Sequence, residues 1–111
     1  MGRKRIYYRY EIPKSVVVIV KSVCADYDRR RLLSEMGDLD ESVKNRYDYL
    51  NGAIDSALVE IDPGIRRVLL DDIRINRGYD YSPASPFLTK NSYYMRKKKI
   101  IHDIAKGLSL I

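Results

Sequence analysis

Residues 89–108 read TKNSYYMRKKKIIHDIAKGL, and this stretch is the strongest indication of the fold expected for the chain. Thr89 is a suitable N-cap, and Gly107 stands near the end of the pattern, where helices often stop. Apolar residues recur at helical spacing and predict one buried face. That face consists of Tyr94, Ile101, Ile104 and Leu108, with Ile100 and Ala105 beside it.

The preceding residues predict a second helix and a break. Asp62 as N-cap and Pro63 at the first helical position predict a helix over residues 62–77, which Gly78 ends. Closely spaced prolines make residues 79–86 irregular. A helix, a break and a basic amphipathic helix are what a helix-turn-helix DNA reader requires. In that motif the front of the second helix meets the DNA and its back packs on the first helix.

The first half of the chain predicts a helical hairpin. Pro13 suits a first helical turn, and the apolar spacing runs on through Leu32, Leu33 and Met36 to a break at Gly37. The β-branched run Val16–Val20 would equally suit a strand. After Asp40 as N-cap, apolar residues follow a heptad-type pattern to Ile61. This second helix either packs antiparallel on its predecessor or forms the seam of a coiled-coil dimer.

The sequence therefore predicts an all-α fold with four to five helices. Its expected parts are a basic, tyrosine-rich arm over residues 1–12, a helical hairpin over 13–61 that is a candidate dimerisation element, and a helix-turn-helix region over 62–111.

Positive charge is concentrated at the two ends of the chain. Residues 1–14 carry five Lys or Arg and one Glu, and residues 92–111 carry five Lys or Arg and one Asp. The residues between them are slightly acidic, so the net charge of +6 comes from the ends. This segregation favours a polyanionic partner, and nucleic acid more than a membrane surface. The alternative is two solvated basic tails.

The predicted DNA contacts lie at the front of the last helix. A helix N-terminus carries free N–H groups and partial positive charge, which favour phosphate. Asn91 and Arg96 have planar groups suited to base edges, whereas the lysines suit backbone phosphates. The predicted contact residues are Thr89, Lys90, Asn91, Ser92, Met95, Arg96, Lys97, Lys98 and Lys99, with Arg3, Lys4 and Arg5 of the arm.

The alternative, non-functional interpretation is that Arg96–Lys99 forms the solvated face of an amphipathic helix. Two features favour DNA instead. The cations sit in the front half of the helix, where the helix dipole disfavours them unless an anion binds. They also follow a turn and a helix of suitable length. The arm has the same two interpretations, a DNA-contacting element or a disordered terminus.

Other classes of protein find little support. The single cysteine, Cys24, excludes an intramolecular disulfide and a cysteine-based metal cluster, and we expect it to be buried. The longest apolar run, Val16–Val20, is too short to cross a bilayer, so a cytoplasmic protein is expected. His102 is the sole histidine and is expected to be structural, and Asp71 and Asp72 are expected at the surface.

No phosphate-binding glycine loop, metal-ligand pair or nucleophile–base spacing is present in the sequence. We therefore expect a protein that is not an enzyme and uses no metal or cofactor. A metal-dependent nuclease stays open as an alternative, because its carboxylates would converge from separate helices.

Several short motifs resemble the phage-encoded RinA-like (ArpU-like) transcriptional regulators. They are Tyr10-Glu11-Ile12-Pro13-Lys14, Asp26-Tyr27-Asp28-Arg29-Arg30, Ala57-Leu58-Val59-Glu60-Ile61, and the tail from Asn91 to Ile101 with Ala105-Lys106-Gly107-Leu108 and Ile111. The resemblance spans nearly the whole chain. It implies a prophage protein of low-GC Gram-positive bacteria that controls late genes through a helix-turn-helix similar to that of sigma factors.

By that resemblance, residues 89–99 would enter the major groove and Tyr94 would be a packing residue. The chain departs from the family pattern at Phe87-Leu88-Thr89, where a smaller, more polar turn is expected. Expected partners are double-stranded DNA, RNA polymerase as a further candidate, and a second copy if the hairpin is a dimer seam, with no membrane. The expected location is the cytoplasm of a bacterial host, associated with the nucleoid.

Two competing functions remain. A phage assembly or packaging protein, such as a small terminase subunit, would also combine a helix-turn-helix with an oligomerising helical pair. RNA binding by the arm, which is rich in tyrosine and arginine, is a weaker alternative, because no RNA-binding signature accompanies it.

Overall fold

The computed structural model describes residues 10–111, and regular structure in this range is entirely helical. The five α-helices confirm the predicted all-α fold of four to five helices. They are α2 (Lys14–Ala25), α3 (Tyr27–Met36), α4 (Glu41–Leu58), α5 (Pro63–Ile75) and α6 (Lys90–Gly107), with a short 3-10 turn, η1 (Tyr79–Tyr81), before the last.

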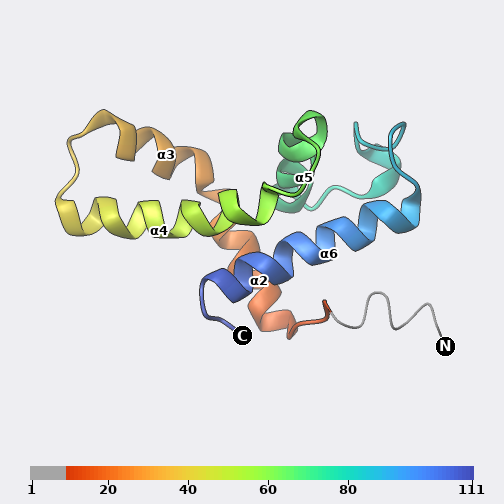
Figure 1. Cartoon of the computed structure of the whole chain (residues 1–111), viewed down its shortest axis with the longest axis horizontal. Coiled ribbons are helices and arrows are strands. Elements are labelled where there is room, and N and C mark those ends of the chain that lie inside the picture. Colours follow the sequence, from red (N-terminus) through yellow and green to blue (C-terminus); the bar gives the residue numbers. More distant parts are fainter. Residues whose placement is uncertain (1–9) are drawn as a thin grey trace.

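The helices form an elongated body of 50 × 29 × 21 Å. Figure 1 shows α3 lying back along α4 at one end, α5 at the other, and α6 running beside α4 in the opposite direction. The helix α2 crosses behind α4 and α6 and packs on α5 and α6. Consequently the back of α6 rests chiefly on α4 and α2, and not on α5 as a compact helix-turn-helix would place it.

The helix predicted from Pro13 to Met36 is in fact two helices, because the chain breaks at Asp26. The reason is the buried side chain of Arg30, whose guanidinium donates to the carbonyl oxygen of Val23. An unbroken helix would give that carbonyl to the amide of Tyr27. A second hydrogen bond, 2.8 Å from Arg30 Nε to Asn51 Oδ1, ties the break to α4.

The pairing of α3 with α4 supports the interpretation of the heptad-type pattern as a hairpin within one chain. Gly37 ends α3 in the left-handed conformation, with φ of 77°, as the predicted break requires. The prediction that Leu32 and Met36 continue the apolar face is wrong, since their side chains are 60% and 57% exposed. The break at Asp26 changes which side of α3 faces the core.

The helix α5 begins as predicted and ends earlier. The Asp62 carboxylate accepts a hydrogen bond from the amide of Gly64, and Pro63 opens the helix. The end lies at Ile75 and not at Arg77, because Asn76 adopts the left-handed conformation. The carbonyl of Asp72 then accepts hydrogen bonds from the amides of both Asn76 and Arg77, which closes the helix end.

One buried cluster from all five helices forms the core. Ile54, Leu69, Ile73, Ile100 and Ile104 are among its fully buried members, and Cys24 is buried as expected. Within residues 10–111, no helix combines the length and apolar character needed to span a bilayer.

Candidate nucleic-acid interface

The N-terminus of α6 is capped and faces outward. Thr89 Oγ1 accepts a hydrogen bond of 3.2 Å from the amide of Ser92, which confirms the predicted cap. Lys90 and Asn91 are exposed in the first turn. The positive end of the helix dipole and the two polar side chains therefore share one exposed tip.

The rotation of α6 about its own axis is set by a buried polar cluster. Tyr93, not Tyr94 as predicted, is the buried aromatic residue of this helix, with 0% exposure against 37% for Tyr94. Its hydroxyl lies 2.8 Å from Asp72 Oδ2, which also accepts from the hydroxyl of Ser82. Burial and the hydrogen bond to Asp72 raise the pKa of Tyr93, so the hydroxyl keeps its proton and donates.

The prediction that Asp72 lies at the surface is therefore wrong, because this carboxylate is fully buried. Its second oxygen accepts no hydrogen bond but lies 3.3 Å from Arg77 Nε, so the two groups form an ion pair. The cluster joins α5, the irregular residues 76–89 and α6. Tyr79 extends this cluster. Its hydroxyl lies within hydrogen-bonding distance of the carbonyl oxygens of Ser85 and Leu88, and its amide donates to the Tyr94 hydroxyl.

With this rotation fixed, the four consecutive cations of α6 fall on two different sides. Lys97 and Lys98 lie on the side toward α2, which we call the basic side. The Lys97 ammonium group donates to the carbonyl oxygen of Arg77 at 2.8 Å and lies over the rings of Tyr93 and Tyr94. Lys98 forms an ion pair with Glu11.

Arg96 and Lys99 lie on the other side, which we call the balanced side because acidic groups surround it. The ammonium group of Lys99 lies 2.7 Å from Asp103 and 3.3 Å from Glu60. Arg96 Nε donates to Ser92 Oγ at 3.2 Å, and its side chain lines one hollow together with Asp62. The positive charge of Lys99 is therefore offset by two carboxylates, whereas Arg96 has a hydroxyl partner.

The two sides continue into the first turn of α6. Seven residues span nearly two turns of an α-helix, so residues seven apart share a side. Lys90 and Asn91 therefore align with Lys97 and Lys98 on the basic side. Ser92 aligns with Lys99 on the balanced side, and the partly buried Met95 lies between the two rows.

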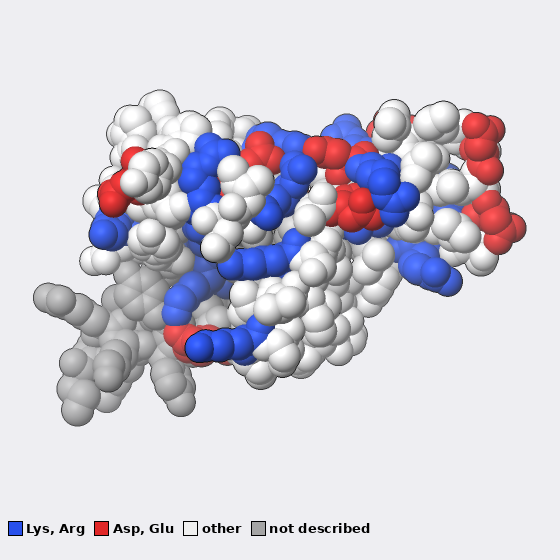
Figure 2. Space-filling model, turned by 180° about the vertical axis from the view of Figure 1, so that it is seen from behind, with Lys and Arg blue, Asp and Glu red and all other residues white. Residues whose placement is uncertain are grey.

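The basic side extends beyond α6. Lys21 of α2 donates to Asn76 Oδ1 at 2.8 Å, which places its ammonium group beside the end of α5 where Lys97 also binds. Figure 2 shows Lys and Arg side chains spread over this face with acidic side chains among them, and further acidic side chains at the far end, where α3 meets α4.

The predicted arm contacts, Arg3, Lys4 and Arg5, lie outside the described residues. The first described residues lie beside α6. The ring of Tyr10 packs edge-on against His102, with ring centroids 5.5 Å apart, and Glu11 pairs with Lys98. His102 also lies 3.1 Å from Asp103, so it has the structural surroundings that were expected.

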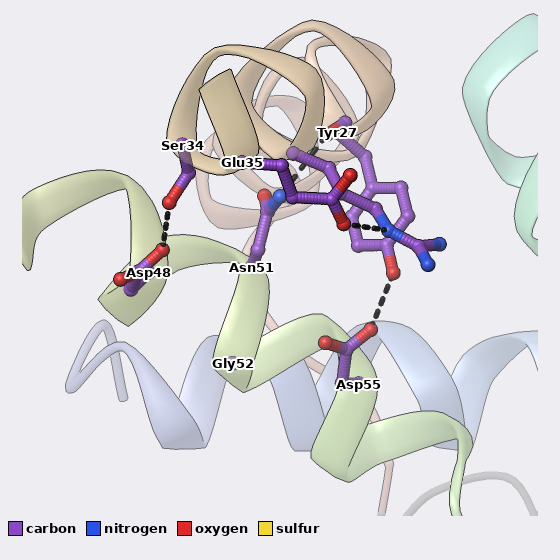
Figure 3. A pocket seen from close by; sticks show the side chains of 8 residues that line it. Tyr27, Ser34, Glu35, Asp48, Asn51, Gly52 and Asp55 are labelled. Carbon is purple, nitrogen blue, oxygen red and sulfur yellow. Dashed lines mark hydrogen bonds and ion pairs between the residues drawn. The ribbon is translucent and has the colours of Figure 1, made fainter. Parts of the chain in front are cut away.

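A polar hollow of about 430 Å³ between α3 and α4 is the main alternative site (Figure 3). Its carboxylates have partners: Asp55 accepts from Tyr27, Asp48 from Ser34, and Glu35 from Arg31. Burial, followed by the hydrogen bond to Asp55, raises the pKa of Tyr27 to about 12, so this hydroxyl stays protonated. These contacts join the two helices. No group of three or more His, Cys, Asp or Glu in the described part of the chain could hold a metal ion.

Three residues of the site escaped prediction: Lys21, Asp72 and Tyr93. A signal existed for Asp72, which stands three residues after Leu69 on the buried stripe of α5. Tyr93 is seven residues before Ile100, so it also fits the apolar spacing. No local signal marks Lys21, because its neighbours at the site come from α5 and α6.

Comparisons of the chain with protein-family models, with curated proteins and with solved structures gave no match.

Proposed function

We propose that this chain is a sequence-specific, double-stranded-DNA-binding transcriptional regulator of phage or prophage origin, in which α6 reads the major groove. The observation that carries the proposal is the basic side of α6. There Lys97 and Lys21 bond to neutral oxygens, and exposed Lys90 and Asn91 continue the row to the capped helix tip. Such a surface suits a polyanion.

The predicted contact residues have different roles in this proposal. Asn91, at the exposed tip, is the residue best placed to meet a base edge, and its amide suits adenine. Lys90 and Lys98 suit backbone phosphates. Arg96 was predicted as a second base reader, but its guanidinium already donates to Ser92, so we give it a smaller part in this proposal.

The wider functional context is part of the same proposal. The resemblance to RinA-like regulators supports late-gene control in a bacterial host, a location at the nucleoid and RNA polymerase as a partner. No cofactor or catalytic step is required for this role. The arm cations Arg3, Lys4 and Arg5 would add phosphate or minor-groove contacts.

Selection of bound sequences from a random duplex pool tests the proposal. The wild-type chain should enrich one motif, and Asn91→Ala should relax discrimination at one base pair by about 1–3 kcal/mol. Arg96→Ala is the matched control in the adjacent turn and should leave the motif largely intact. A wild-type chain that retains no duplex even at low salt would overturn the proposal.

An assembly or packaging role is the second candidate. The observation that favours it is the exposed apolar pair Leu32 and Met36 on α3, which suits contact with another copy. Sedimentation with and without DNA distinguishes the two roles. A closed ring supports packaging, whereas a monomer or dimer supports regulation.

A further inference from the structure

A pocket of about 230 Å³ lies between α2 and α6, on the basic side. Apolar side chains line part of it, including Val17 and Ile101, together with the ring of Tyr94. The remaining lining includes three lysines, Lys21, Lys97 and Lys98. The pocket thus combines an apolar wall with the side chains of three lysines.

Two of these ammonium groups converge on the end of α5. Lys21 donates to the Asn76 side chain and Lys97 to the Arg77 carbonyl oxygen, each at 2.8 Å, and these acceptors belong to neighbouring residues. Both acceptors are neutral. Within residues 10–111, the structure gives neither lysine an ion pair with a carboxylate, and each ammonium has three N–H donors to offer.

The proximity of the two lysines carries an electrostatic cost. Burial lowers the pKa of Lys97 most strongly, the charge of Asp72 raises it, and the charge of Lys21 has a smaller effect that lowers it again. An anion placed between the two ammonium groups would remove this cost. The carboxylate that also lines the pocket, Glu11, is already paired with Lys98.

We propose that this pocket between α2 and α6 is a phosphate-binding site, with Lys21 and Lys97 as its donors. The source of this phosphate rests on the proposed function. When α6 lies in the major groove, a phosphate of the adjacent DNA backbone enters the pocket. The apolar wall then contacts the adjoining deoxyribose. A free phosphate compound shares this chemistry, and the experiment separates the two sources.

The first arm measures duplex binding at several salt concentrations for wild type, Lys21→Gln and Lys44→Gln. Each substitution removes one positive charge, but Lys44 lies on α4 and pairs with Asp48, away from the pocket. Because Lys21→Gln loses one phosphate contact, the slope of its log binding constant against log salt concentration should be shallower by about 0.9 units. Lys44→Gln should keep the wild-type slope. Thermal melts of both variants verify that they fold.

The second arm needs no DNA. Inorganic phosphate is titrated at constant ionic strength against chloride, while NMR follows the ammonium groups of Lys21 and Lys97 and the amides of Asn76 and Arg77. Saturable shifts confined to these groups, and absent in Lys21→Gln, are expected.

The two arms have separable outcomes. Phosphate shifts together with a flattened slope support a backbone phosphate as occupant. Phosphate shifts can also occur in a chain that binds no duplex, or in one whose salt dependence is unchanged by Lys21→Gln. Either result supports the pocket but assigns it to a free phosphate compound, which overturns DNA as the source of the phosphate. An unchanged slope with no phosphate shift overturns the site.

Discussion

The two sides of α6 carry cations from the same run of sequence, yet they differ in how the fold neutralises them. On the balanced side, Lys99 has two carboxylates within 3.3 Å. On the basic side, Lys98 has one carboxylate partner, Glu11, whereas Lys97 is bonded to a carbonyl oxygen and α2 brings in a further lysine, Lys21. Consecutive residues of a helix point about 100° apart, so four adjacent cations cannot form one surface. The scaffold decides which of them are paired with a carboxylate.

The largest expected effect comes from removing the group that fixes this arrangement. Asp72→Ala should lower the free energy of unfolding by about 3–5 kcal/mol, because Arg77 loses its buried partner and two hydroxyls lose an acceptor. Urea unfolding measures the change. The matched control, Asp71→Ala, removes a partly exposed carboxylate paired with Arg67 and Arg74 and should cost about 1 kcal/mol or less. Equal losses would show that Asp72 does not set the rotation of α6.

The second prediction compares one lysine from each side. Lys98→Ala should weaken duplex binding and flatten its log–log salt dependence by about 0.9 units, because a phosphate contact is lost. Lys99→Ala should leave the slope near the wild-type value, since Asp103 and Glu60 already offset its charge. Filter binding or fluorescence anisotropy at several salt concentrations measures both. A slope change for Lys99→Ala as large as that for Lys98→Ala would abolish the distinction between the sides.

Local signals were enough to predict the helices themselves. The cap at Thr89, the Asp62-Pro63 start and the left-handed Gly37 each act within a few residues, and each is found in the structure. The break at Asp26 could not be predicted in this way. It depends on Arg30, whose guanidinium reaches Asn51, 21 residues away along the chain.

The same reasoning explains what was missed at the candidate site. The residues of α6 were identified from sequence, but their partners are remote: Glu11 is 87 residues from Lys98, and Glu60 is 39 from Lys99. Tyr93 and Tyr94 both fit the amphipathic pattern, and the buried carboxylate of Asp72 selects Tyr93. Which cation is neutralised is therefore a property of the tertiary structure, and the sequence pattern treats all four alike.

A third prediction concerns the acids that pair with each side. Glu11→Gln should strengthen duplex binding by a few-fold, about 0.5–1 kcal/mol, because Lys98 no longer shares its charge with a carboxylate. Glu60→Gln makes the same change in net charge beside Lys99 and should have the smaller effect, since Asp103 still holds that ammonium group. Anisotropy titrations at one salt concentration measure both. An equal gain from the two variants would mean that only net charge matters and that the sides are equivalent.

The smallest expected effect tests whether Asp103 neutralises Lys99. Partial burial raises the pKa of Asp103, but hydrogen bonds from Lys99 and His102 outweigh it, so the folded pKa lies below the ordinary value of 3.8. A carboxyl with a lowered folded pKa stabilises the fold above that ordinary value, and the contribution disappears as pH falls through the folded pKa. A double-mutant cycle with Lys99→Gln and Asp103→Asn should therefore give a coupling of about 0.2–1 kcal/mol at neutral pH and none in acid. Zero coupling at neutral pH would mean that Asp103 does not hold Lys99, and this lysine would then count among the proposed DNA contacts.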